Sequence, residues 1–208
     1  LSRGLGDVYK RQMLFPLLCL TAISAIILGM GMTTTAVYIT VAALIVPSLI
    51  QAGVTPIAAH MFAFYFGVVS TITPPVALAS FAGAAIAKSP PMATAVESSK
   101  VGIAKYIVPF AFIYNPALLM EGSYWISLYS LLSVLLAYWS MTLGLEGYLN
   151  KPLNVYTRII AFISSILLLL PPLSIFYGIS GFLLNGVGLV ILIFVYLIQG
   201  KFKLGHMK

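Results

Sequence analysis

The chain has 208 residues, of which 61% are hydrophobic and only 7% charged, and its formal net charge is +7. Soluble domains carry about 25% charged residues, so this composition excludes a soluble globular protein and predicts an all-α polytopic membrane protein. The basic residues are scattered over short loops without a basic aromatic face, which argues against a nucleic-acid partner and leaves membrane lipid as the expected surroundings.

The first twelve residues differ from the rest of the chain. Residues 1–12 are polar and join abruptly to the apolar run that starts at Met13. The piece from Gly6 to Gln12 resembles a non-native tail, so we set residues 1–12 aside from the fold reasoning. If this tail is artificial, we expect the natural protein to extend upstream.

The first two predicted helices form a hairpin over residues 13–52. Residues 13–28 form one apolar helix, which ends at a glycine- and threonine-rich tip over residues 29–35. Residues 36–52 form the second helix, in which Pro47 predicts a kink. A re-entrant hairpin and two full membrane crossings both fit this pattern.

A broken helix follows over residues 56–87. Its first half is the aromatic stretch 56–69, and its second half is the alanine-rich stretch 76–87. Between them, residues 70–75 read Ser-Thr-Ile-Thr-Pro-Pro, and the two prolines prevent a continuous helix. In lipid, such a break survives only inside protein or against a polar cavity.

The remaining elements divide the chain into two parts. An interfacial helix over residues 92–105 and a helix over residues 106–120, interrupted by Pro109 and Asn115-Pro116, complete the first part, residues 13–120. Three further apolar spans, residues 123–143, 158–174 and 178–199, and a basic tail make up the second part, residues 121–208.

The charges predict an orientation for these spans. If residues 106–120 and the three later spans each cross once, the basic loop residues all fall on one side, and only Glu121 lies in the opposite loops. The positive-inside rule makes the basic side cytoplasmic, so we expect a cytoplasmic C-terminus. The basic residues on that side are Lys88, Lys100, Lys105, Lys151, Arg158, Lys201, Lys203 and Lys208.

The two helix breaks carry the predicted chemistry. Glycines let the backbone turn, adjacent prolines leave carbonyls free, and hydroxyls add neutral oxygen ligands of the kind that sodium needs. The N-terminus of the helix after the tip also suits a carboxylate. We therefore predict that the two breaks converge near the middle of the membrane, with sodium at Gly31, Thr34, Ser70 and Thr73. The full set of predicted ion- and substrate-binding residues is Gly29, Gly31, Thr33, Thr34, Thr35, Ser70, Thr71, Thr73 and Pro74.

The same residues have a plainer interpretation. Glycine and proline are common in membrane helices, and hydroxyl side chains often bond back to their own backbone, so each break alone is as well explained by a structural kink. His60 is expected to pack at an interface rather than relay protons, and Asn115 to mark a kink. The occurrence of two hydroxyl-rich breaks together favours a transport site.

Three motifs resemble the large permease subunit of TRAP transporters, the tripartite ATP-independent periplasmic transporters. They are residues 29–39 (GMGMTTTAVYI), residues 59–77 (AHMFAFYFG to STITPPVA) and residues 109–116 (PFAFIYNP). The resemblance is strong over residues 13–120 and is closest to the fused, TAXI-associated branch, whose additional C-terminal helices residues 121–208 resemble. One departure is Thr33-Thr34-Thr35 at the tip, where family members often have Pro-Thr-Thr.

This resemblance implies an elevator-type, sodium-coupled importer of an organic acid, usually a carboxylate, in the bacterial inner membrane. A periplasmic solute-binding protein would deliver the substrate, sodium would be the coupling ion, and no ATP or other cofactor would be used. It also implies a further partner, either an N-terminal half of the permease that is missing here or a small permease subunit.

The residues also bear on two other classes of protein, an intramembrane enzyme and a membrane scaffold. An intramembrane enzyme would need a Ser/His dyad, an Asp pair or a zinc motif, yet Asp7 is the only aspartate and His60 has no histidine partner at helical spacing. A non-transporting scaffold or assembly subunit would gain nothing from two helix breaks. The sequence therefore favours a permease that is not an enzyme.

Overall fold

The computed structural model describes residues 2–149, 151–173, 175–176 and 179–200, and it describes side chains for residues 14–149, 151–173 and 180–197. The chain divides into two compact units, Leu1–Leu119 and Met120–Lys208, which are treated separately below. The predicted basic tail after residue 200 lies outside the described residues.

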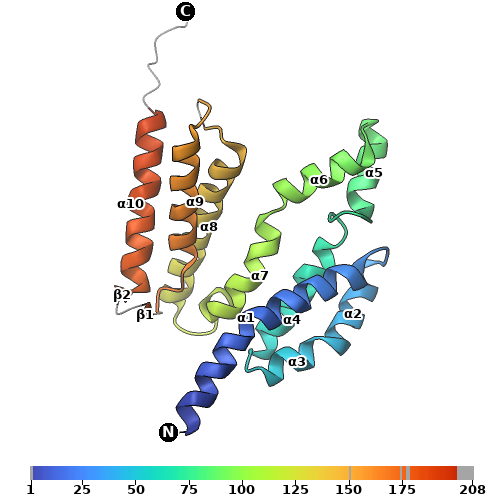
Figure 1. Ribbon diagram of the computed structural model, residues 1–208, viewed down its shortest axis with the longest axis horizontal. Helices are drawn as coiled ribbons and strands as arrows, with labels where there is room; N and C mark the ends of the chain where they lie inside the picture. The colour runs from blue at the N-terminus through green and yellow to red at the C-terminus, as the bar shows by residue number, and fades with distance from the viewer. Residues whose placement is uncertain (1, 150, 174, 177–178, 201–208) are drawn as a thin grey trace, which may run out of the picture. The chain divides into compact units, whose positions relative to one another are not determined.

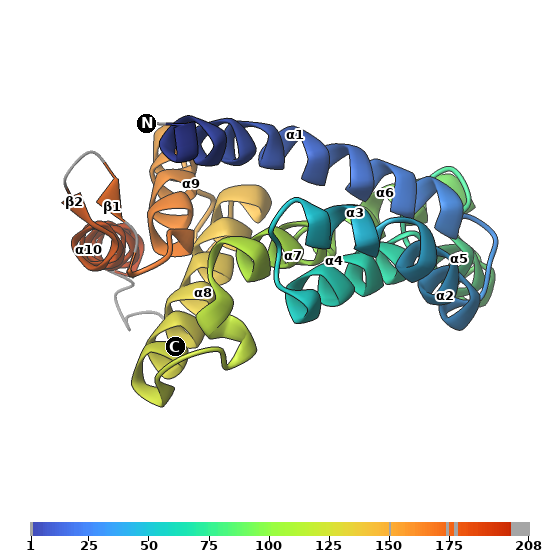
Figure 2. The same cartoon turned by 90° about the horizontal axis from the view of Figure 1, so that it is seen from below.

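The first unit opens with a helical hairpin, α1 (Ser2–Gly29) and α2 (Thr34–Leu44), which packs on α4 (Pro56–Val69) (Figures 1 and 2). The helix α1 begins at Ser2, so residues 2–12 are helical in their backbone and extend the expected helix of residues 13–28. Fully buried apolar side chains fill the contact between these helices, because each helix turns one apolar face inward. The largest are Leu18, Val37, Val41, Phe62 and Phe66.

The expected single helix over residues 36–52 is in fact two helices. The helix α2 ends at Leu44, and α3 (Val46–Gln51) starts after Ile45. Pro47 is the physical reason, because it lacks an N–H and is tolerated only in the first turn of a helix. Gly53, two residues after the end of α3, has a positive φ of 94°.

The broken helix has the expected position. The helix α4 ends at Val69, an irregular segment follows, and α5 (Leu78–Ala87) begins two residues later than expected. The interfacial segment is α6 (Pro91–Val101), and α7 (Ala104–Tyr114) follows it after a short elbow at Gly102 and Ile103. Pro109 lies inside α7, which ends before Asn115, and a short 3-10 helix, η1 (Pro116–Leu119), closes the unit.

The helices described in the second unit are α8 (Tyr124–Glu146), α9 (Val155–Leu169) and α10 (Gly181–Gly200). A two-residue ladder, β1 (Ile175–Phe176) with β2 (Ile179–Ser180), precedes α10. The helix α9 ends earlier than the expected residue 174, because Leu170 precedes Pro171 and adopts an extended conformation. It also starts three residues earlier than expected, at Val155.

Buried serines join the helices of the second unit. Ser133 and Ser140 of α8 donate hydrogen bonds to the carbonyls of Leu168 and Ala161 in α9, at 2.7 and 2.8 Å. Ser164 of α9 donates to the carbonyl of Gly188 in α10 at 2.7 Å. Small side chains at these contacts let the helices approach closely, as in membrane helix bundles.

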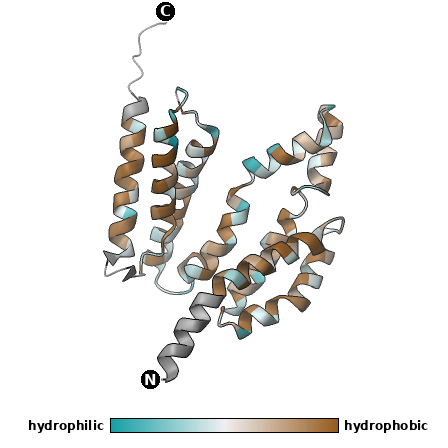
Figure 3. Ribbon diagram, in the orientation of Figure 1, coloured by the Kyte–Doolittle hydropathy of each residue, from teal (hydrophilic) through white to brown (hydrophobic). Residues whose placement is uncertain are grey.

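Hydrophobic residues predominate in most of the described helices, as the ribbon colouring of Figure 3 shows. Over the residues whose side chains are described, α8 alone is long and apolar enough to cross a membrane by length and composition, and the other apolar helical stretches within those residues, including parts of α1 and α10, are 10–17 residues long. Short apolar helices separated by breaks are what the sequence analysis expected in the first unit. The all-α architecture is confirmed.

Candidate functional site: the two helix breaks

The two predicted breaks touch each other at Gly29 and Ser70. Gly29 ends α1, and a methyl group added to its Cα would lie 2.7 Å from Ser70 Cβ, would meet the Ser70 hydroxyl, and would lie 3.1 Å from Val37 Cγ1. Ser70 is fully buried. Glycine is therefore required at this position for steric reasons, and the hairpin tip rests directly on the start of the break after α4.

Three hydroxyls at this break bond to the last turn of α4. Ser70, Thr71 and Thr73 donate to the carbonyls of Gly67, Val68 and Val69, at 2.6, 2.8 and 2.7 Å. These are the local back-bonds that the plainer interpretation of the sequence expected. A hydroxyl that donates its proton keeps its oxygen lone pairs, so these bonds also orient the oxygens as acceptors for a cation.

Both breaks leave backbone carbonyls free. Within the described part of the chain, no hydrogen bond reaches the carbonyls of Met30, Gly31 or Met32 at the tip, or those of Thr73, Pro74 or Pro75 at the other break. The prolines explain part of this, because they have no N–H with which to continue a turn. Free carbonyls beside hydroxyl oxygens are suitable ligands for a hard monovalent cation.

The threonines of the tip form the start of α2. Thr33 is the N-cap residue, with an extended backbone and no side-chain cap bond, and Thr33, Thr34 and Thr35 are all exposed. Gly31 is also exposed and has a positive φ of 81°, which glycine adopts without strain. The α2 N-terminus thus presents free N–H groups and three hydroxyls.

A second helix N-terminus follows the proline break. The N–H groups of Ala77 and Ser80 at the start of α5 donate to no described residue, and the Ser80 hydroxyl, only 5% exposed, has no hydrogen-bond partner among the described residues. Ser80 is not among the residues predicted from the sequence. A buried hydroxyl without a partner at a helix N-terminus is a feature of an anion site.

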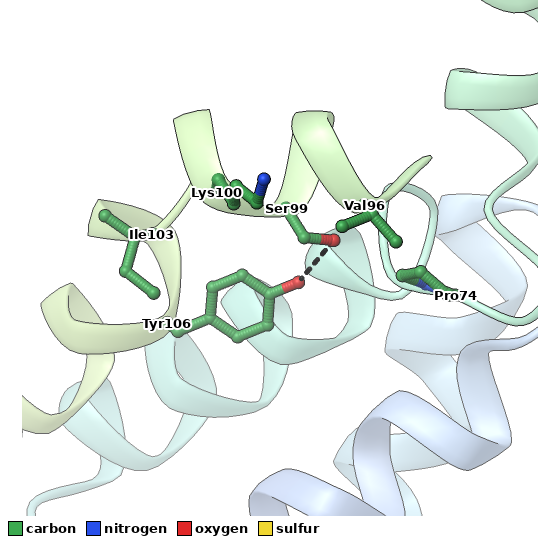
Figure 4. A pocket seen from close by; sticks show the side chains of 6 residues that line it. All are labelled: Pro74, Val96, Ser99, Lys100, Ile103 and Tyr106. Atoms are coloured by element: carbon green, nitrogen blue, oxygen red, sulfur yellow. Dashed lines mark hydrogen bonds between the residues drawn. The ribbon is translucent and has the colours of Figure 1, made fainter. Parts of the chain in front are cut away.

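Sequence reasoning also missed Ser99 and Tyr106, which bond to the break from α6 and α7. Ser99 donates to the carbonyl of Ile72 at 3.0 Å, and the Tyr106 hydroxyl lies 2.7 Å from Thr73 Oγ1 and 3.4 Å from Ser99 Oγ. Figure 4 shows the side chains of Tyr106 and Ser99 pointing toward each other. Residues 92–105 looked merely interfacial, and only the fold brings them to the break.

An open pocket lies beside this cluster. It has a volume of about 310 Å³, and one wall is Pro74 of the break (Figure 4). Lys100, at its edge, forms a 2.9 Å ion pair with Glu97, and both side chains are more than half exposed. The pocket is lined by Pro74, Val96, Ser99, Lys100, Ile103 and Tyr106.

The other polar residues singled out in the sequence lie apart from this cluster of contacts. His60 Nδ1 lies 3.1 Å from the Tyr38 hydroxyl in an exposed contact between α4 and α2. Asn115 is the C-cap of α7, directly before Pro116. Among the described residues, no group of three or more His, Cys, Asp or Glu side chains gathers as a metal site.

A helical hairpin meeting a broken helix, with free carbonyls at each interruption, defines a polytopic membrane protein of the transporter class. A family model described as "Tripartite ATP-independent periplasmic transporter, DctM component" matches residues 5–124, more than half of the chain. The chain therefore belongs to this family of TRAP transporter permeases. The comparisons found no match among curated proteins and none among solved structures.

Proposed function

We propose that this chain is part of a sodium-coupled permease that imports an organic acid across the bacterial inner membrane, supplied by a periplasmic solute-binding protein. It works with the remainder of the permease, either an N-terminal half or a small subunit. Sodium is the coupling ion, and the chain performs transport rather than catalysis.

The contact between Gly29 and Ser70 is the observation that carries this proposal. It brings the hairpin tip and the proline break together, each with free carbonyls. Several neutral oxygens bind sodium well. A site built from them spares the protein the cost of burying a lone charged side chain in the membrane. We assign the ion to Gly31 and Thr34 of the tip together with Ser70 and Thr73 of the break.

A carboxylate substrate suits the two helix N-termini. The N–H groups at the starts of α2 and α5 are directed out of their helices, and each start has hydroxyl side chains, Thr34 and Thr35 in one and Ser80 in the other. Helix N-termini favour anions because their unpaired N–H groups and the helix dipole both present positive charge. We propose that the substrate carboxylate binds between these starts, next to the sodium.

The proposal is tested by uptake into proteoliposomes that contain the complete permease to which this chain belongs. The binding protein is added outside with a radiolabelled carboxylate, and an inward sodium gradient is compared with an equal potassium gradient, without ATP. We expect uptake only with sodium and with the binding protein. Equal uptake in potassium would refute sodium coupling, and uptake without the binding protein would refute that partnership.

Replacing Thr73 by Val tests the ion site itself. Valine keeps the shape of threonine but removes one oxygen ligand, a loss of about 1–3 kcal/mol by analogy with an unmade buried polar contact. We expect the sodium concentration for half-maximal uptake to rise about tenfold to hundredfold at normal expression. An unchanged half-saturation would mean that the Thr73 hydroxyl is structural and that the ion site lies elsewhere.

A further inference from the structure

The break after α4 is held from outside by two hydroxyl side chains, Ser99 of α6 and Tyr106 of α7. They reach consecutive residues of the break, since Ser99 donates to the Ile72 carbonyl and Tyr106 contacts the Thr73 hydroxyl. The elbow between α6 and α7 also packs tightly there. A methyl group added to Gly102 would lie 2.7 Å from Ile72 Cδ1 and 2.9 Å from the carbonyl oxygen of Ser98.

The protons in this cluster have one arrangement that satisfies every short contact. The Thr73 hydroxyl donates a hydrogen bond to the Val69 carbonyl at 2.7 Å, and the Ser99 hydroxyl donates one to the Ile72 carbonyl. Tyr106 is therefore the donor in its contact with the Thr73 hydroxyl. The Tyr106 hydroxyl also faces Ser99 Oγ, as a donor, at 3.4 Å (dashed in Figure 4). This is the longest contact of the cluster, so the single tyrosine proton serves mainly the 2.7 Å contact with Thr73. Thr73 Oγ1 then keeps one lone pair free.

We propose that Tyr106 and Ser99 are positioning residues. They hold the break so that the free lone pair of the Thr73 hydroxyl and the free backbone carbonyl of Thr73 face the transported ion. This inference rests on the proposed function, because it assigns the held oxygens to the sodium site. Neither residue touches the ion. Tyr106 acts through the Thr73 hydroxyl, and Ser99 acts through the Ile72 carbonyl, one peptide unit before it.

Ser99 and Tyr106 together form a clamp on the break. Their placement makes this clamp more than an ordinary packing contact. The break has free carbonyls at Thr73, Pro74 and Pro75, so hydrogen bonds of its own backbone do not hold these groups in place. Polar contacts from a neighbouring helix can fix such a segment when the segment itself cannot. Pro74 also forms one wall of the pocket that Ser99 and Tyr106 line, so the clamp borders an open pocket.

The decisive experiment replaces Tyr106 by Phe in the complete permease and measures sodium half-saturation and maximal uptake separately. We expect the half-saturation to rise about threefold to tenfold, as for the loss of one hydrogen bond, with little change in maximal rate. Tyr65→Phe is the matched control, because Tyr65 keeps its ring contact with Phe112 and its hydroxyl has no hydrogen bond to the described residues. Ser99→Ala is paired in the same way with Ser98→Ala.

A double substitution separates positioning from general loosening. If Tyr106 acts through Thr73, then Tyr106→Phe adds less than about a twofold change in a Thr73→Val background, because the two effects are coupled. A full additional rise in that background would overturn the inference. Equal half-saturation in Tyr106→Phe and Tyr65→Phe would overturn it as well.

Amide hydrogen exchange of residues 70–80 decides the question if the wild-type permease proves independent of sodium. That result would reject the proposed ion coupling, yet the clamp would still predict about tenfold faster exchange of this segment in Tyr106→Phe than in Tyr65→Phe. Equal exchange in the two variants would reject the clamp. The failure of the proposed function and the failure of this inference are therefore distinguishable.

Discussion

Gly29 is the residue on which the meeting of the two breaks depends. Its lack of a side chain lets the end of α1 lie against Ser70, a buried residue some forty positions later in the chain. Gly31, two residues further on, serves a different purpose, because its positive φ reverses the chain and nothing lies within 4 Å of an added methyl group. The two glycines of one motif thus meet a steric and a conformational requirement.

Replacing Gly29 by Ala should therefore weaken the first unit. The added methyl group overlaps the Ser70 side chain, and overpacking of this kind costs about 1–3 kcal/mol. Gly83→Ala is the matched control, because Gly83 lies in α5 with nothing within 4 Å of an added methyl group, and alanine favours helix by about 0.5–1 kcal/mol. Thermal unfolding in detergent measures both, and equal midpoints would show that the two breaks do not touch.

At the scale of an element, the C-terminal end of α8 shows how a helix in an apolar protein is closed. Arg158 of α9 donates from Nε to the carbonyl of Gly144 and from a terminal nitrogen to that of Leu145, both at 2.8 Å. The last carbonyls of a helix lack partners inside the helix and carry partial negative charge, so a guanidinium satisfies both requirements. Gly144 and Gly147 leave room for α9 and for the Arg158 side chain.

Replacing Arg158 by Ala should destabilise the second unit. It removes two charge-assisted hydrogen bonds from a partly buried position, which we expect to lower the free energy of unfolding by about 1–3 kcal/mol. Lys151→Ala removes a positive charge from an exposed side chain nearby in sequence and should change it by less than about 0.5 kcal/mol. If both variants unfold at the same temperature, the capping role of Arg158 is wrong.

At the scale of the whole molecule, the distribution of basic residues predicts which side of the membrane each loop faces. The basic loops are expected in the cytoplasm and the loop at residues 120–123 in the periplasm, because translocation of positive charge is disfavoured. A reporter active only in the cytoplasm should therefore work when fused after Lys208. The same reporter inserted after Gly122 should be silent.

The opposite pattern in these two fusions would overturn the topology, and activity at both positions would show that the three helices between them do not cross as expected. Because α8 starts two residues after Gly122, this pair of fusions bears on its crossing together with the spans that follow. The C-terminal position lies outside the described residues, so the fusion supplies information that the fold does not.

The sequence alone determined the membrane class, the family and the position of the helix break at the adjacent prolines. Continuous apolar stretches and the scarcity of charge required helices in lipid, and the adjacent prolines at residues 74 and 75 stopped a helix whatever surrounded them, because a missing N–H is a local property. For the same reason the start of α4 at Pro56 agreed with its expected position. Pro47 likewise predicted a local irregularity, a kink, near the position where the helix splits at Ile45.

Only the tertiary structure decided which residues meet. The contact of Gly29 with Ser70, and the bonds from Ser99 and Tyr106 to the proline break, join positions that are distant along the chain. Which side chains of α6 and α7 face the break depends on how each helix is rotated about its axis. The sequence of residues 92–105 does not predict that rotation for its segment, because hydroxyls occur on several of its faces. Local chemistry therefore set where the chain breaks, and packing between helices set what each break lies against.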